Sequence, residues 1–297
     1  MAATYTLKLP AADAPAIQRF LDEHGFEFAE APHAFWTARG PEVIATFYCS
    51  GKLLLQGKEA DTWRGLLGDV TADARPYHRA LQQHPTPAPA CWIGTDEAGK
   101  GDYFGPMVVA GVAIRREQLE LLHTLGIDDS KAIADARLPE MEQAILALGH
   151  SEVIVITPPR YNALHAKMGN VNRLLAWAHG RVIETLLEAT DADWVLIDRF
   201  AEEPVIRRGL GDRGRAVRVS MRPRAEEDPA VAAASVLARC AYLRGLKSLS
   251  RRFGVHLHPG AGAPTLTSGR QFLETHGRAA LGEVAKVHFA TTEQIGG

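Results

Sequence analysis

The chain has 297 residues, of which 46% are hydrophobic and 23% charged, with a formal net charge of −2; this is the composition of a soluble globular protein long enough for two domains. No apolar run reaches the roughly 18 residues of a membrane helix, and the first residues, MAATYTLKLPAADAPA, lack the basic start and apolar core of a signal peptide. Cys49, Cys91 and Cys240 are odd in number and far apart, which predicts reduced thiols, a cytoplasmic location and no zinc site.

The N-terminal 81 residues predict a small α+β domain, with a sheet and helices on one face of it. A hairpin turn is indicated by Ser50-Gly51-Lys52 between two apolar runs, and Asp13 with Pro15 marks the start of a helix. No catalytic constellation is evident here. The predicted elements are strands over residues 5–9, 43–49 and 53–56, and helices over residues 13–25 and 59–67.

Residues 82–90 alternate proline with small residues, which favours an extended, semi-rigid linker. The linker divides the N-terminal domain, residues 1–81, from a larger domain over residues 91–297.

In the larger domain, strands and helices alternate, which is typical of an α/β layer architecture. An apolar run closes on Asp96-Glu97 and a second one, Trp194 to Ile197, closes on Asp198. Further strands are predicted over residues 107–114, 153–157 and 216–221, and helices over residues 138–148, 171–187 and 230–246, the last one opened by Pro229.

Asp96 and Glu97 are followed at once by Gly99, Gly101 and Gly105. Two adjacent carboxylates at the end of a buried strand repel each other unless a cation compensates them. The glycines allow the backbone to approach a phosphate or a sugar closely. This stretch therefore predicts a divalent-metal site beside a polyanion.

The same stretch also fits the phosphate-loop spacing G-x-x-x-x-G-K, from Gly94 to Lys100. A nucleotide-binding loop needs a hydroxyl at the next position, which is Gly101 here, and two carboxylates would lie inside the phosphate cradle. A nucleotide-binding loop is therefore disfavoured.

Asp198 ends the second buried strand, and in an α/β sheet the chemistry lies where strands end. If the two strands are neighbours, Asp96, Glu97 and Asp198 face one cleft, and Glu226 or Glu227 can supply a fourth acid. Such a set binds two Mg²⁺ ions about 4 Å apart and suits attack of water on a phosphodiester. Each acid taken alone can equally well end a strand or begin a helix.

Basic residues form two clusters in the C-terminal half, which supports a polyanion partner, although such clusters also serve solubility. They are Arg207, Arg208, Arg213, Arg215, Arg218, Arg222 and Arg224, and then Arg244, Lys247, Arg251 and Arg252.

Several of these segments together resemble one known family. Residues 94–106 resemble the signature of type 2 ribonucleases H, and their Gly-Asp-Tyr-Phe-Gly-Pro tail is similar to ribonuclease HIII in particular. The resemblance continues, in the family's order, through Asp129-Ser130-Lys131, Asp198-Arg199-Phe200-Ala201 and Arg224-Ala225-Glu226 with residues 230–235. Residues 50–58 resemble the family's additional substrate-binding domain.

The resemblance implies a ribonuclease H-like catalytic domain, a central mixed sheet flanked by helices, preceded by a small α+β domain with a fold like the TATA-box-binding protein. It implies hydrolysis of the RNA strand of RNA/DNA hybrids, giving 5′-phosphate and 3′-hydroxyl ends. Asp96, Glu97, Asp198 and Glu226 would hold two Mg²⁺ or Mn²⁺ ions. The expected substrate contacts are Gly99, Lys100, Gly101, Lys131, Lys52, Gln56 and Lys58.

Four alternatives stay open. The segment between Glu226 and the following helix is one residue shorter than the family spacing, so Glu227 can replace Glu226 as the fourth acid. The enzyme can instead incise at a single ribonucleotide in DNA, as ribonuclease HII does, or the chain can bind hybrids without cleaving them. Lys52, Gln56 and Lys58 can also be ordinary residues of a sheet edge. A monomer is expected.

Overall fold

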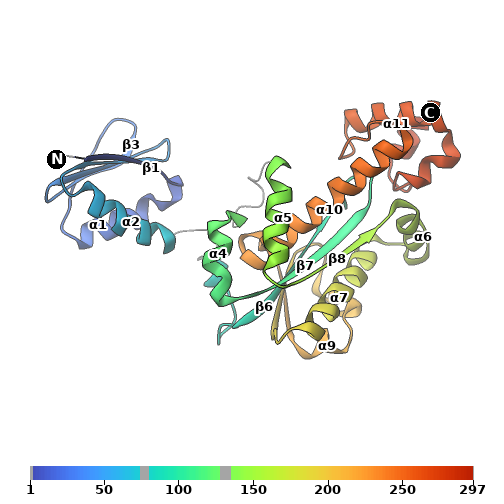
Figure 1. Cartoon of the computed structure of the whole chain (residues 1–297), viewed down its shortest axis with the longest axis horizontal. Coiled ribbons are helices and arrows are strands. Elements are labelled where there is room, and N and C mark those ends of the chain that lie inside the picture. The colour runs from blue at the N-terminus through green and yellow to red at the C-terminus, as the bar shows by residue number, and fades with distance from the viewer. Residues whose placement is uncertain (1–2, 74–79, 128–134, 297) are drawn as a thin grey trace. The chain divides into compact units, whose positions relative to one another are not determined.

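The computed structural model describes residues 3–73, 80–127 and 135–296, which form two compact units, residues 1–83 and 84–297 (Figure 1). The predicted contact residue Lys131, with Asp129 and Ser130, lies outside the described residues. In the part of the chain that the structure describes, no helix has both the length and the apolar character of a membrane span.

The first unit is an antiparallel five-stranded sheet with two helices on one face (Figure 1). Alternating strands bury one side against these helices, with Ile17, Leu21, Phe47, Leu53 and Leu55 fully buried. In sheet order the strands are β1 (Ala3–Lys8), β5 (Lys52–Gly57), β4 (Val43–Tyr48), β3 (Ala34–Gly40) and β2 (Glu27–Ala29), and the helices are α1 (Ala14–Glu23) and α2 (Ala60–Asp73).

The predicted hairpin between β4 and β5 is confirmed. Gly51 has φ +80° and its amide donates to the Tyr48 carbonyl at 2.9 Å, so the turn uses a backbone conformation that favours glycine. Strands β2 and β3 had not been predicted: β2 has only three residues, and β3 shifts register between Ala34 and Trp36, which breaks its alternation. The observed architecture fits the expected α+β domain.

The second unit is built on a mixed five-stranded sheet. Strands β10, β9 and β6 run parallel, and β7 runs antiparallel to both β6 and β8. This confirms the ribonuclease H-like fold class. In sheet order the strands are β10 (Arg218–Arg222), β9 (Trp194–Asp198), β6 (Cys91–Ala98), β7 (Met107–Arg115) and β8 (His150–Ile156).

Two long helices cover the sheet, α10 (Pro229–Phe253) on one face and α7 (Val171–Ala189) on the other. A glycine permits each close approach. A side chain on Gly94 would fall on the α10 backbone at Ala230, and one on Gly111 would fall on Val182 of α7. The N-terminal turn of α10 is therefore held directly against β6.

Shorter helices surround this core. Helix α5 had been predicted, and the others, mostly one to three turns long, had not. They are α4 (Leu119–Thr124), α5 (Leu138–Ala147), α6 (Pro158–Met168), α8 (Glu203–Gly209), α9 (Asp212–Ala216), α11 (Ala263–His276) and α12 (Thr291–Gly296). Strand β10 begins two residues later than predicted because Ala216 still belongs to α9.

Residues 82–90 contain neither helix nor strand, but their first part is packed into the second unit. His84 is buried, and its Nε2 lies 2.7 Å from Asp228 Oδ2. Asp228 also accepts from Trp92 Nε1 and from the amide of Ala230, both at 3.0 Å, which caps α10. One buried carboxylate thus joins this segment, β6 and α10.

Candidate active site

The carboxylates of the two buried strands meet at one edge of the sheet. Strands β6 and β9 are parallel neighbours, paired from Trp92↔Trp194 to Thr95↔Ile197. Asp96 and Asp198 follow at the next level of the same register. The condition for a shared cleft, that the two strands are neighbours, is therefore met, and it places both acids at the carboxyl ends of β6 and β9.

Asp96 and Glu97 point to opposite faces of the sheet, as successive strand residues do. Asp96 lies on the α10 side, where Ser235 hydrogen-bonds it, and its Oδ1 accepts the Glu97 amide at 2.7 Å. Glu97 lies on the α7 side, where its Oε2 is 3.4 Å from His179 Nε2 and its Oε1 is 3.5 Å from Lys100 Nζ. Each acid is thus oriented by a different helix.

Asp198 is connected to the predicted fourth acid through the backbone. Its Oδ1 accepts the amide of Ala225 at 2.9 Å, where Arg224, with φ +56°, leads into the short turn Ala225–Glu227. The negative charge of Glu226 raises the pKa of Asp198, so the two carboxylates are electrostatic neighbours. Asp228, the next acid along, is already used as the cap of α10.

The pKa values divide the acids into two kinds. Burial raises the pKa of Asp96 to about 7, and the neighbouring Glu97 charge adds to this. The pKa of Asp198 is raised by burial and by Glu226 and Glu97. Burial would also raise the pKa of Glu97, but His179 and Lys100 outweigh it and the pKa is lowered. Among the described residues, Asp96 and Asp198, both partly buried, therefore have no cation that outweighs the effect of burial on their pKa.

Carboxylate oxygens of this kind suit Mg²⁺ or Mn²⁺, which are hard cations, so the donor chemistry fits a metal site. Among residues 3–73, 80–127 and 135–296, no three His, Cys, Asp or Glu side chains already form a metal-ligand set. The fit rests on the chemistry and the charge of these acids.

The glycines and Lys100 beyond the two acids have different environments. Gly99 has φ +84°, and a side chain there would fall on the Pro106 carbonyl, so the fold itself requires glycine at this position. Gly101 is exposed with open space around it. Lys100, expected to contact substrate, lies beside Glu97, and its Nζ donates to the Phe200 carbonyl at 3.5 Å.

In the first unit, Lys52 and Gln56 are exposed on the face of the sheet opposite the helices. Lys52 pairs across the strands with Lys8, and two like charges in this position favour an anion nearby. Lys58 lies beyond β5, where its Nζ forms an exposed ion pair with Glu42 Oε1 at 2.6 Å.

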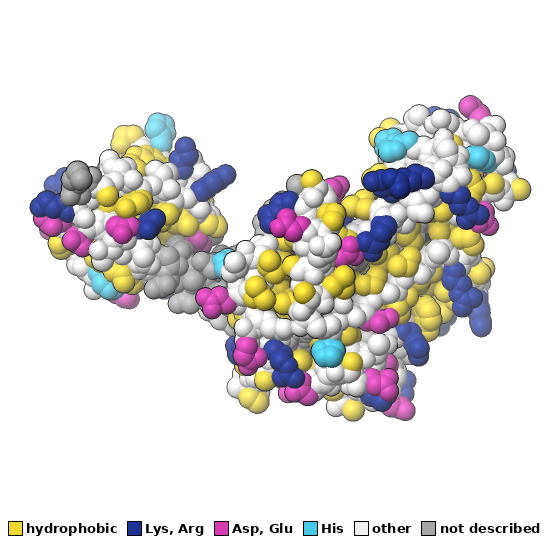
Figure 2. Space-filling view, viewed as in Figure 1, with side chains coloured by type: hydrophobic (Ala, Val, Ile, Leu, Met, Phe, Trp, Pro, Cys, Tyr) yellow, Lys and Arg dark blue, Asp and Glu magenta, His cyan; other side chains and the backbone are white. Residues whose placement is uncertain are grey.

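The two basic clusters are partly neutralised. Arg207 and Arg213 pair with Glu203 and Glu188, and Arg244 pairs with Glu142 through both of its terminal nitrogens. Figure 2 shows Lys and Arg side chains over the part of the second unit that holds α10 and α11.

Sequence reasoning missed the buried partners of Glu97. His179 Nδ1 lies 2.8 Å from Thr95 Oγ1, and the ring stacks on Phe200 with centroids 4.8 Å apart. A signal was available: His179 falls on the apolar stripe of α7 with Leu175 and Val182, so helical periodicity places it inward. What it touches there depends on tertiary packing.

Comparison with known proteins identifies the family. The ribonuclease HII family model matches residues 93–292. Ribonuclease HIII of Chlamydia abortus is 37% identical over 278 residues, 93% of this chain and 91% of the relative. Ribonuclease HIII of Protochlamydia amoebophila is 34% identical over 98% of this chain and 95% of the relative.

Solved structures agree. Bst-RNase HIII in complex with Mn²⁺ matches with a TM-score of 0.70 at 29% identity, covering 99% of this chain and 98% of that chain. Aquifex aeolicus RNase H3 matches with a TM-score of 0.56 at 26% identity, covering 96% and 99%. The chain therefore belongs to the ribonuclease HII family and, together with its ribonuclease HIII relatives, is an endoribonuclease that acts on RNA/DNA hybrids.

Proposed function

We propose that Asp96, Glu97, Asp198 and Glu226 form the catalytic centre, which hydrolyses the RNA strand of a hybrid with two Mg²⁺ or Mn²⁺ ions and leaves 5′-phosphate and 3′-hydroxyl ends. The observation that carries this proposal is the in-register placement of Asp96 and Asp198 on neighbouring parallel strands. When bound, such ions activate water and stabilise the leaving oxygen. The Mn²⁺ in the Bst-RNase HIII structure is consistent with a divalent ion.

The protein's own contribution is to orient the four acids. Asp96 is directed by Ser235 and the Glu97 amide, Glu97 by His179 and Lys100, and Asp198 by the amide of Ala225. Such partners hold metal ligands in a fixed direction. Because Glu226 raises the pKa of Asp198, we favour Glu226 over Glu227 as the fourth acid.

Substrate binding is proposed to involve both units. The backbone at Gly99 and Gly101 would approach the RNA strand, where 2′-hydroxyls distinguish RNA from DNA. Lys52, Gln56 and Lys58 would contact phosphates of the hybrid, and Lys100 and Lys131 would add positive charge near the substrate. In this proposal residues 1–81 bind the duplex, residues 91–297 cleave it, and the chain acts as a cytoplasmic monomer.

Cleavage of two end-labelled duplexes tests the function. One is a continuous RNA/DNA hybrid and the other is DNA with a single ribonucleotide; each is incubated with Mg²⁺ or Mn²⁺, beside a chelator control. We expect cutting of the continuous hybrid only when metal is present. Efficient cutting at the single ribonucleotide would instead indicate ribonuclease HII-like specificity. Binding of the hybrid without cutting would contradict the proposed cleavage and indicate a protein that only binds hybrids.

A further inference from the structure

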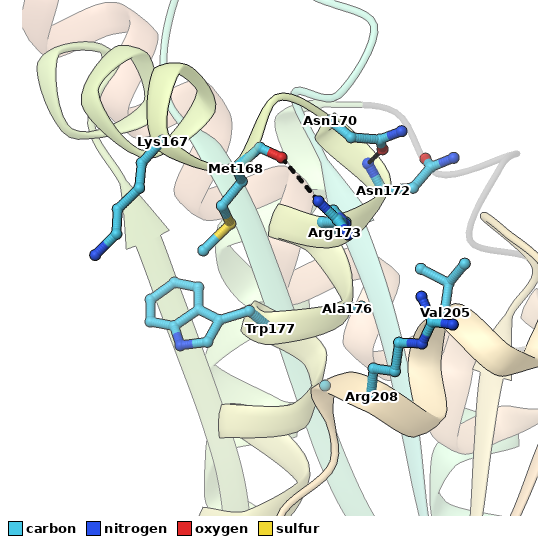
Figure 3. Close-up of a pocket in the computed structure, with 10 residues that line it drawn as sticks. Lys167, Met168, Asn170, Asn172, Arg173, Ala176, Trp177, Val205 and Arg208 are labelled. Atoms are coloured by element: carbon cyan, nitrogen blue, oxygen red, sulfur yellow. Dashed lines mark hydrogen bonds between the residues drawn. The ribbon is translucent and has the colours of Figure 1, made fainter.

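A pocket in the second unit lies outside the carboxylate site. Its volume is about 580 Å³, and it lies between the end of α6, the first half of α7 and helix α8 (Figure 3). One side of the pocket is lined by Lys167 and Met168 of α6 and by Arg173 and Trp177 of α7. The other side is lined by Arg208 of α8.

Three cations surround this pocket without a carboxylate partner. Lys167, Arg173 and Arg208 are exposed, and within the described part of the chain none of them forms an ion pair. Arg173 Nη1 donates to the Met168 carbonyl at 3.4 Å. The neighbouring Arg207, by contrast, is paired with Glu203 at 2.6 Å. Positive charge is therefore concentrated at this pocket and favours an anion.

The wall of the pocket between these cations is apolar and contains an aromatic ring. Trp177 is partly buried, and in Figure 3 its indole lies below Met168 and beside Lys167. Ala176 and Val205 complete the apolar lining. An aromatic face next to unpaired cations suits a nucleotide of a duplex, because its sugar packs on the ring while its phosphate binds the guanidinium groups.

The pocket is linked to the carboxylate site through α7. Asn172, Ala176 and His179 share one stripe of this helix, and His179 is 3.4 Å from Glu97. Arg173 lies six residues before His179, about 9 Å along the helix at 1.5 Å per residue. The pocket and the histidine that contacts Glu97 are therefore less than two turns apart on the same helix.

We propose that the pocket formed by Lys167, Arg173, Trp177 and Arg208 binds one nucleotide of the hybrid, near the phosphodiester that is cleaved. This rests on the proposed function, because it takes the bound nucleic acid to be the substrate. Arg173 and Arg208 bind the phosphate, and Trp177 packs against the sugar of the same nucleotide.

Hybrid binding by variants of the full chain tests this subsite. Anisotropy of a fluorescein-labelled RNA/DNA hybrid is measured in chelator, so that nothing is cleaved, over a series of NaCl concentrations. Arg173→Gln with Arg208→Gln should weaken binding about tenfold or more and reduce the slope of log K against log [NaCl] by about 0.9 per lost phosphate contact. Trp177→Leu should weaken binding about fivefold with the slope unchanged.

Arg207→Gln is the matched control, because Arg207 is adjacent on α8 but its guanidinium is paired with Glu203. It should bind within about twofold of the unaltered protein. Equal affinity and equal salt slope in all these proteins would overturn the subsite. Because the arginine side chains are exposed, the arginine variants test the subsite even if Trp177→Leu does not fold.

The same proteins separate this inference from the proposed function. If the unaltered chain fails to cleave with Mg²⁺ or Mn²⁺ while the arginine pair still weakens hybrid binding, the nuclease centre is wrong and the pocket stands. If the unaltered chain cleaves and the arginine pair binds and cleaves normally, the pocket is wrong and the centre stands.

Methylphosphonate substitutions then identify which strand of the hybrid the pocket binds. Each substitution removes the negative charge of one phosphate, first along the RNA strand and then along the DNA strand. At the phosphate held by the pocket, the substitution should weaken binding of the unaltered protein but not that of the arginine pair. If every substitution in both strands weakens the two proteins equally, no phosphate is bound by these arginines and the subsite is refuted.

Discussion

His179 contacts two residues near the carboxyl end of β6: its Nε2 lies 3.4 Å from Glu97 Oε2, and its Nδ1 lies 2.8 Å from Thr95 Oγ1. Thr95 and Glu97 are two residues apart and therefore point to the same face of the sheet. The imidazole is fully buried and stacked on Phe200, the second residue after Asp198. One ring thus touches residues on or beside both acid-bearing strands.

We expect His179→Ala to weaken divalent-ion binding by about 10- to 100-fold, because Glu97 loses the partner that orients it. Titration of Mn²⁺ followed by electron paramagnetic resonance measures this directly, without substrate. His179→Gln, which can still donate a hydrogen bond, should recover part of the loss. The control is His150→Ala, an exposed histidine at the start of β8. Unchanged Mn²⁺ affinity in His179→Ala would show that the contact does not orient Glu97.

Asp96→Asn should reduce hybrid cleavage by about 1,000-fold or more, since it removes one carboxylate of the proposed metal site. Binding of the hybrid in chelator should stay within a few-fold, because the basic residues are unchanged. Gel-based cleavage and anisotropy are measured on the same preparation. Lost binding with unchanged cleavage per bound complex would contradict a catalytic role for Asp96.

Glu226 and Glu227 are adjacent, and only one of them is expected to be the fourth acid of the catalytic centre. Glu226→Gln should reduce cleavage by about 100-fold or more, because the Glu226 charge acts on Asp198. Glu227→Gln serves as its matched partner and should cleave within about twofold of the unaltered protein. The reverse ranking in a single-turnover assay would assign the fourth acid to Glu227.

Gly99 and Gly101 should respond differently to alanine. Gly99→Ala places a side chain at φ +84° against the Pro106 carbonyl and should destabilise the fold by about 2 kcal/mol or more. Gly101→Ala enters open space and should change stability by less than about 0.5 kcal/mol, while weakening hybrid binding if the backbone approaches the substrate. Urea unfolding and anisotropy separate the two effects. If Gly101→Ala destabilised the fold as much as Gly99→Ala, the predicted difference between the two glycines would be wrong.

Lys286 makes the unfolding free energy of the protein depend on pH. Its buried Nζ donates to the carbonyls of Asp102 and Gly105 at 2.8 and 2.9 Å, and burial lowers its pKa from 10.5 to about 8. A lysine with a lowered pKa in the folded state contributes stability above pH 10.5 that is lost as the pH falls through about 8.

At about 1.4 kcal/mol per pKa unit, this contribution is on the order of 3 kcal/mol. The difference in unfolding free energy between the unaltered protein and Lys286→Met should therefore shift in favour of the unaltered protein between pH 7 and pH 9.5, in a urea series. A constant difference across that range would mean that Lys286 keeps an ordinary pKa.

Sequence predicted the parts of the fold whose signal is local. The runs ending in Asp96 and Asp198 are mostly apolar, with Thr95 the exception, because β6 and β9 are buried on both faces. Helices α8 and α9, of seven and five residues, are too short for a periodic pattern. Helix α10 continues seven residues past its predicted end, since residues 247–253 leave the core and lose the apolar pattern.

The candidate site shows the same division. The acids could be named from the ends of their strands, but the order of strands in the sheet, which brings Asp198 beside Asp96, is a tertiary property. The contact between Glu97 and His179 joins residues 82 positions apart, so no local pattern contains it.

The carboxylate of Asp228, with its three donors, determines where the catalytic half can be cut from the rest of the chain. A shortened protein that begins at Cys91 would keep every acid of the proposed centre but would lose His84, leaving one oxygen of a buried charge without its partner. A protein that begins at or before Gln83 retains that partner. The safest start for an independent domain is therefore set by one histidine rather than by the first strand.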